Sequence, residues 1–142
     1  MGPPIIVVDT NVLLSASLHG GKPLKISRMI RLNLRQLAIS EKQLRELERI
    51  LTYPKFNLSK GQQTTILLTI NALAQVVTTP LKVQVIDDDP TDNMIIETAL
   101  QAGAATIITG DKHLLKLGHF HKIEIVTPHE FLRRVAQEIN GR

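Results

Sequence analysis

The stretch Ile5-Ile6-Val7-Val8-Asp9 decides the fold class of this 142-residue chain. Four consecutive β-branched residues are typical of a strand that is buried on both faces, because a half-exposed strand would alternate with polar residues. The run ends at a carboxylate, and in parallel α/β sheets the reactive crevice lies beyond the carboxyl ends of the strands. The segment therefore predicts a central parallel strand with an acid at its functional end.

The rest of the chain alternates between strand and helix patterns. Residues 105–109 and 123–127 are further strand candidates, and residues 36–39 and 83–86 are weaker ones. Helices are expected from near Pro23, after Ser40, over residues 59–77 and 90–102, and after Pro128. This alternation predicts an α/β fold, a three-layer α/β/α sandwich around a mainly parallel sheet. We expect residues 1–142 to form a single domain, since no repeat or linker interrupts the pattern.

Two of these helices carry more detailed signals. Ser40 precedes Gln43 by three residues, which is the spacing of a capping box at a helix start. In the segment 59–77, an apolar stripe runs from Ile66 to Val77, which predicts that the helix continues to Val77.

The composition excludes several classes of protein. Cysteine is absent, which excludes disulfides, thiolate metal sites and cysteine nucleophiles. The apolar runs are much shorter than a membrane span, and Asp9 comes too early for a signal peptide, so we expect a cytoplasmic protein with no membrane association. The 17 Lys and Arg residues outnumber the 13 Asp and Glu residues, giving a net charge of +4. Residues 83–111 nevertheless hold acids and no Lys or Arg, which suits a polyanion bound through divalent cations, although ordinary solvated charge gives the same composition.

Two acids follow predicted strands at their carboxyl ends. Asp9 follows the first strand directly, and Asp111 follows residues 105–109 after one glycine. Because the ends of neighbouring parallel strands open on one crevice, both carboxylates could face it. Each could instead simply cap the next helix, since Asp is a favoured N-cap residue. That explanation is weaker for Asp9, because Thr10 and Asn11 could also cap.

Asp92 lies in the first turn of the fourth predicted helix. Asp89 is expected as the N-cap and Pro90 as the first helical residue. Ile96 and Ala99 follow Asp92 by four and seven residues, so its carboxylate lies on the apolar stripe of the helix. The helix dipole contributes only about 0.3–1 kcal/mol, which is too little to bury a charge. A metal ion would compensate it, which favours a functional role for Asp92 over capping.

Glu46 and Glu48 border the apolar stripe of the helix after Ser40 from opposite sides. Periodicity does not choose between them. A solvated helix face would account for either residue.

Four segments of the chain together resemble the PIN-domain family. They read VVDTNVLLSA, ISEKQLRELERIL, DPTDNMIIETAL and TGDKHLL, and the similarity extends into a closing segment at residues 125–132. Within the family they are most similar to the bacterial and archaeal toxin components of toxin–antitoxin pairs. Each motif alone is a modest signal, whereas all four in this order are a strong one.

The resemblance implies an acidic active site made of Asp9, Glu46, Asp92 and Asp111. It selects Glu46 over Glu48, and Asp92 over the three aspartates that precede it. Asn11 and Thr109 also match the family, which implies that they position ligands or water, and Glu97 could belong to a layer around the acids.

Such a site would belong to a metal-dependent endoribonuclease. Mg²⁺ and Mn²⁺ prefer the hard oxygen ligands that carboxylates supply. Four converging acids would repel one another without cations, and one or two ions would activate water and stabilise charge at phosphorus. We expect Asp9 and Asp111 to be the principal ligands, with Asp92 and Glu46 holding a second ion directly or through water.

The expected partners are an RNA substrate and an antitoxin protein. Lys112, beside the predicted site, and the evenly spaced Lys25, Arg28 and Arg31 are candidates for phosphate binding, although a solvated face accounts equally for the last three. Trp is absent, and with one Tyr and three Phe base stacking should contribute little. The resemblance implies an antitoxin that could insert a basic side chain among the carboxylates, and PIN-type domains often form homodimers.

Three histidines near the last acidic motif offer an alternative chemistry. His113, His119 and His121 could form a transition-metal site or an acid–base pair. Their spacing does not fit a helical ligand pair four residues apart, and Gly118 indicates a loop, so we favour the carboxylates.

Other functions fit the sequence less well. A phosphotransferase of the haloacid-dehalogenase type would need an acid where Asn11 stands and would favour one where Leu115 stands. The chain has no glycine-rich P-loop and no Gly-x-Ser-x-Gly motif, which disfavours nucleotide hydrolases and serine esterases. The more serious alternative is a non-catalytic PIN-fold module that binds RNA or protein without cutting.

Overall fold

A mainly parallel sheet forms around the strand that the sequence predicts at its centre. The computed structural model describes residues 2–19, 21–79 and 90–141. Within them, six strands pair in the order β3-β2-β1-β4-β6-β5, and only β5 is antiparallel to its neighbour. The strands are β1 (Ile5–Val8), β2 (Gln36–Ser40), β3 (Ala74–Val77), β4 (Thr106–Ile108), β5 (His119–Phe120) and β6 (Ile123–Val126). The predicted α/β fold class is confirmed.

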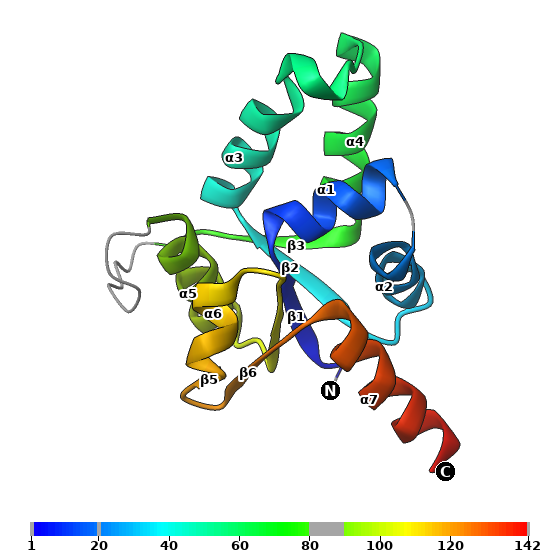
Figure 1. Cartoon of the computed structure of the whole chain (residues 1–142), viewed down its shortest axis with the longest axis vertical. Helices are drawn as coiled ribbons and strands as arrows, with labels where there is room; N and C mark the ends of the chain where they lie inside the picture. The colour runs from blue at the N-terminus through cyan, green and yellow to red at the C-terminus, as the bar shows by residue number, and fades with distance from the viewer. Residues whose placement is uncertain (1, 20, 80–89, 142) are drawn as a thin grey trace.

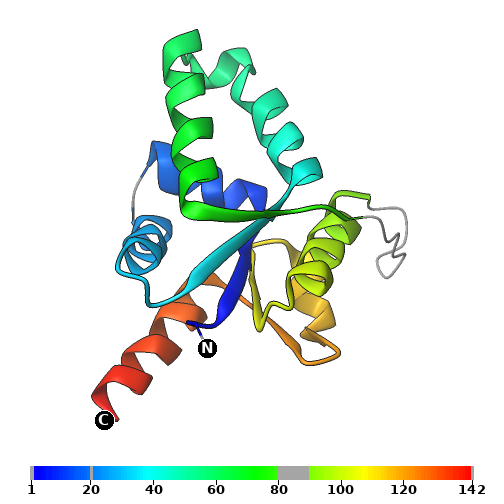
Figure 2. The same ribbon diagram turned by 180° about the vertical axis from the view of Figure 1, so that it is seen from behind.

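Helices cover both faces of this sheet, as Figures 1 and 2 show. One hydrophobic core packs α1, α2, α3, α4 and α7 against the sheet, and a second packs α5 and α6 against its other face. The helices are α1 (Thr10–Leu18), α2 (Lys22–Arg31), α3 (Glu41–Leu51), α4 (Lys60–Leu73), α5 (Pro90–Ala102), α6 (Lys112–Leu117) and α7 (Pro128–Asn140), with a short 3-10 helix η1 (Pro54–Phe56). In the part of the chain that the structure describes, no helix combines the length and apolar character needed to cross a membrane.

The strand β1 is buried on both faces, as its uninterrupted apolar run predicts. Ile6 and Val8 belong to one core, whereas Val7 belongs to the other. The strand pairs with β4 in parallel register, with Val8 opposite Ile108. Because the two strands end side by side, the residues that follow them emerge at the same edge of the sheet.

The predicted helix over residues 59–77 is wrong in its last turn. The helix α4 ends at Leu73, and Ala74 adopts an extended backbone with φ −103° and ψ 151°. Ala74–Val77 forms β3 instead and pairs with β2. Two adjacent β-branched residues, Val76 and Val77, suit a strand, and pairing with β2 satisfies backbone hydrogen-bonding groups of this segment. The apolar stripe continued by coincidence across this change of structure.

Smaller departures concern helix and strand ends. The hydroxyl of Ser40 accepts the N–H of Gln43, but the Gln43 side chain donates to the carbonyl of Val8, so the predicted capping box is only half formed. Gly118 ends α6 as expected, yet the loop predicted after it contains the two-residue strand β5. The helix predicted over residues 90–102 is confirmed as α5. The strand candidate at residues 83–86 and the cap at Asp89 lie outside the described residues.

Candidate functional site

Thr109 joins the two acids that follow β1 and β4. Its hydroxyl donates to Oδ2 of Asp9 over 2.6 Å and accepts the backbone N–H of Asp111 over 2.9 Å. The Asp9 N–H donates to the carbonyl of Ile108, which continues the β1–β4 pairing to the acid itself. These contacts place Thr109 between the two acids, where the sequence resemblance predicts a supporting role.

The carboxylate of Asp9 is buried, with a relative exposure of 6%. Burial raises the pKa of Asp9 above its ordinary value of 3.8, and the nearby charge of Asp111 raises it further. Hydrogen bonds from Thr109 and from the Asn11 backbone lower this pKa without cancelling the effect of burial. A buried carboxylate next to a second one is an arrangement that a bound cation would stabilise.

Asp111 caps a helix and also borders the site. Its Oδ1 accepts the backbone N–H groups of His113 and Leu114 at the start of α6. The capping explanation considered for Asp111 is therefore correct, but both bonds go to one oxygen, which leaves Oδ2 outside the cap. A carboxylate oriented in this way by a helix start can offer its second oxygen to a ligand.

Asp92 reaches the same place from the other side of the sheet. It lies in the first turn of α5 with a relative exposure of 3%, as its position on the apolar stripe predicts. Asp92, Asp111 and His113 each offer one ligand atom, and these atoms lie within 4.8 Å of one another. Carboxylate oxygens with an imidazole nitrogen form a donor set that fits a divalent cation. Asp9 lies outside this trio but is close enough to Asp111 to interact with its charge.

Glu46 is half-buried on α3. It follows Lys42 by four residues and therefore lies on the same face of the helix. From that face, Nζ of Lys42 lies 3.5 Å from a carboxylate oxygen of Glu97, which is buried on α5. Glu46 therefore lies on the face of α3 that approaches α5, one turn beyond Lys42.

Gln43 is a residue of this region that sequence reasoning treated only as part of a cap. Its side chain is fully buried, and its Nε2 donates to the carbonyl of Val8 over 2.7 Å. This bond holds the start of α3 against the end of β1, directly before Asp9. A polar residue in the first turn of a helix is usually exposed, so the sequence offers no signal for this burial.

An open pocket of about 670 Å³ adjoins the acids. Its lining includes Asp9, Asn11, Asp111, Lys112 and His113. The predicted phosphate-binding Lys112 and the predicted supporting residue Asn11 therefore border the same space as two of the acids. A second cavity of about 300 Å³ between α1, α2 and α4 is mainly apolar, and no acid lines it.

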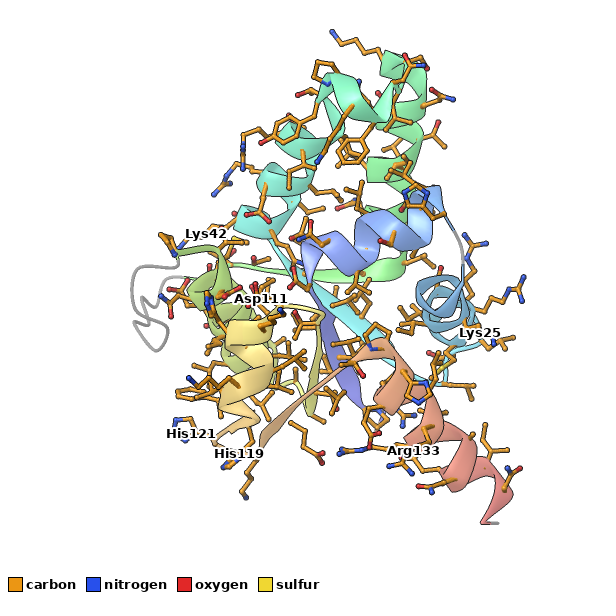
Figure 3. All side chains as sticks on the ribbon, viewed as in Figure 1. Lys25, Lys42, Asp111, His119, His121 and Arg133 are labelled. Atoms are coloured by element: carbon orange, nitrogen blue, oxygen red, sulfur yellow. The ribbon has the colours of Figure 1, made fainter. Side chains whose placement is uncertain are left out.

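The other predicted phosphate-binding residues lie elsewhere. Lys25, Arg28 and Arg31 are exposed on α2, and Figure 3 shows Lys25 well separated from Asp111. His119 and His121 also lie away from Asp111, beyond the far end of α6 (Figure 3). The structure therefore brings together Asp9, Asp92, Asp111 and His113, but not the α2 cations or the two later histidines.

The chain matches the model of one known family. The family model of the PIN domain matches residues 5–113, which span more than half of the chain and include all four predicted acids. The chain belongs to the PIN-domain family. No protein of curated function matches this PIN domain closely enough to count as a relative.

Several solved structures share its fold. The structure of VapBC2 from Rickettsia felis bound to a DNA fragment from their promoter has a TM-score of 0.61 at 17% identity, covering 85% of this chain and 96% of that one. PAE2754 from Pyrobaculum aerophilum has a TM-score of 0.63 at 17% identity, with 96% and 94% covered. FitAcB from Neisseria gonorrhoeae has a TM-score of 0.57 at 16% identity, with 87% and 98% covered. At such identities the likeness shows a common fold.

The raised pKa of Asp9 predicts a stability cost in the metal-free PIN domain. The folded state holds the Asp9 proton more tightly than the unfolded state, so stability falls as pH rises through the interval between 3.8 and the folded-state pKa. Asp9→Asn removes this cost while keeping a side-chain oxygen for Thr109. We expect a higher urea midpoint for the variant at pH 7 in EDTA, with the advantage shrinking toward pH 3.8.

Glu48→Gln is the matched control, because Glu48 is an exposed acid on α3. Its urea midpoint should stay close to that of the wild type at every pH. A wild type at least as stable as Asp9→Asn at pH 7 would mean that Asp9 is not destabilised by its surroundings.

Proposed function

We propose that this PIN domain is a metal-dependent endoribonuclease. Its active site, formed by Asp9, Glu46, Asp92 and Asp111, would hydrolyse phosphodiester bonds in RNA. The convergence of Asp9, Asp92 and Asp111 beyond the carboxyl ends of β1 and β4 is the observation that carries the proposal. It is supported by family membership and by the match of all four acids to the motifs of the family.

The surroundings of the acids suit a phosphodiester substrate. The pocket is open to solvent and large enough for a phosphate with parts of its two flanking sugars. Lys112 on its rim would hold the negatively charged backbone, whose contacts with basic residues are electrostatic and salt-sensitive. Asn11 borders the same pocket and would help to orient water or phosphate oxygens.

In this proposal Asp9 and Asp111 are the principal ligands of Mg²⁺ or Mn²⁺, with Asp92 and Glu46 contributing directly or through water. The bound ion would supply charge neutralisation and an activated water. The hydrogen bond from Thr109 restrains the Asp9 carboxylate beside the Asp111 backbone, which would reduce the reorganisation needed to bind an ion. Lys42 neutralises Glu97, which keeps that buried carboxylate from adding its charge to the site.

Cleavage of labelled single-stranded and structured RNAs tests the nuclease directly. The wild type should cut with Mg²⁺ or Mn²⁺ and not with EDTA. Asp9→Asn should lower the rate by about 100-fold or more, since losing a metal ligand removes several kcal/mol of transition-state stabilisation. Glu46→Gln should be strongly impaired, whereas Glu48→Gln, two residues away on the same helix, should cut at nearly the wild-type rate.

The controls separate three outcomes. Equal cutting by the wild type and Asp9→Asn would assign the activity to another site or to a contaminant. A folded wild type that binds RNA, but does not bind metal and does not cut, would support the non-catalytic binding module. Equal loss in Glu46→Gln and Glu48→Gln would point to α3 as a structural element.

We further propose that the protein is the toxin of a toxin–antitoxin pair. The sequence resemblance and the fold shared with VapBC2 and FitAcB support this role. The pocket beside Asp9 and Asp111 has room for a Lys or Arg side chain from an antitoxin. Adding the product of a neighbouring gene should therefore abolish metal-stimulated cleavage, and unchanged cleavage by a purified complex would contradict the proposal.

A further inference from the structure

His113 borders the acidic site from the first turn of α6. Its Nδ1 lies 3.9 Å from Oδ2 of Asp92, although 21 positions separate the two residues in the sequence. Ligands of an octahedral ion with bonds of about 2.1 Å are about 3 Å apart when adjacent and about 4.2 Å apart when opposite. The separation of these two atoms is therefore one that a shared ion can span.

The position of His113 is set by Asp111, one of the predicted ligands. The backbone N–H of His113 donates to Oδ1 of Asp111 over 2.8 Å. This cap fixes the backbone of His113 next to the carboxylate, while its side chain is 69% exposed and can rotate. The fixed backbone and mobile ring would let the imidazole adjust to an ion between Asp92 and Asp111.

The spacing between Asp111 and His113 differs from that of ligand pairs within one helix. His113 follows Asp111 by two positions, and the two face one space because Asp111 is the cap outside the helix and His113 lies inside it. Of the three histidines near this motif, only His113 lines the pocket with Asp9 and Asp111. His119 and His121 lie beyond the opposite end of α6 (Figure 3).

We propose that His113 is a nitrogen ligand of the metal ion and gives the site a preference for divalent transition metals over Mg²⁺. The inference rests on the nuclease site proposed above and names the class of ion that this site takes. It adds an imidazole to a site otherwise composed of carboxylates.

The preference follows from the chemistry of the ligands. Mg²⁺ keeps an octahedral shell of oxygen atoms and gains little from an imidazole nitrogen. First-row transition ions gain more, in an order that rises from Mn²⁺ through Fe²⁺ to Co²⁺. Removing the nitrogen should therefore weaken Mn²⁺ binding and leave Mg²⁺ binding, which depends on the carboxylates, nearly unchanged.

Two variants and one control test this assignment. His113→Ala removes the ligand, and His113→Asp replaces its nitrogen with oxygen; both changes are at an exposed position where the fold should persist. His119→Ala is the matched control, an exposed histidine away from the acids. Calorimetric titration gives the Mn²⁺ and Mg²⁺ dissociation constants, and pulsed electron paramagnetic resonance of bound Mn²⁺ detects directly coordinated nitrogen.

We expect a ¹⁴N coupling in the wild type and in His119→Ala that both His113 variants lack. His113→Ala should weaken Mn²⁺ binding about tenfold and Mg²⁺ binding less than about twofold. His113→Asp should keep divalent binding but with a lower ratio of Mn²⁺ to Mg²⁺ affinity than the wild type.

The outcomes separate this inference from the proposal beneath it. A wild type that binds Mn²⁺ without ¹⁴N coupling, and whose affinities do not change in His113→Ala, would overturn the role of His113 and leave the carboxylate nuclease standing. A folded wild type that binds neither ion would overturn both.

Discussion

The site depends on one hydroxyl group, that of Thr109. Parallel pairing of β1 with β4 delivers Asp9 and Asp111 to one edge of the sheet, but pairing alone leaves their side chains free to turn away. Thr109 donates to the Asp9 carboxylate and accepts the Asp111 N–H, so it fixes a side chain on one strand and the backbone after the other. The N–H of Thr109 donates to the carbonyl of Val126, which ties this bridge to β6 as well. The sheet thus brings the two acids together, the Thr109 hydroxyl restrains the Asp9 carboxylate, and the start of α6 restrains that of Asp111.

The same arrangement works against stability. Asp9 and Asp92 are nearly inaccessible to water, and Asp9 feels the charge of Asp111 at close range. Buried carboxylates are favourable only when a cation or several donors compensate them. Lys42 pairs with Glu97, and Lys112 lines the pocket beside Asp9 and Asp111. A bound cation would stabilise such a cluster of buried carboxylates.

The predictable parts of the molecule are those that local pattern controls. The run at β1, the helix α5 and the burial of Asp92 follow from periodicity, because each residue is buried by its own element. The change from α4 to β3 escaped prediction because Val77 continues a helical stripe and only pairing with β2 reveals a strand. The burial of Gln43 escaped it because that burial arises from a contact with Val8. The sequence named His113 together with His119 and His121 and could not separate it from them, because the approach of His113 to Asp92 joins residues distant in sequence. Local spacing carries no information on such contacts.

We propose that Asp9, Asp92 and Asp111 share one cation-binding centre. A crystal structure of the protein grown with Mn²⁺, with anomalous differences measured at the manganese edge, tests it most directly. We expect a strong peak about 2.0–2.5 Å from carboxylate oxygens of Asp9 and Asp111, with Asp92 bound directly or through water. A structure saturated with Mn²⁺ that has no peak at this edge of the sheet, or has its only peak among other residues, would contradict it.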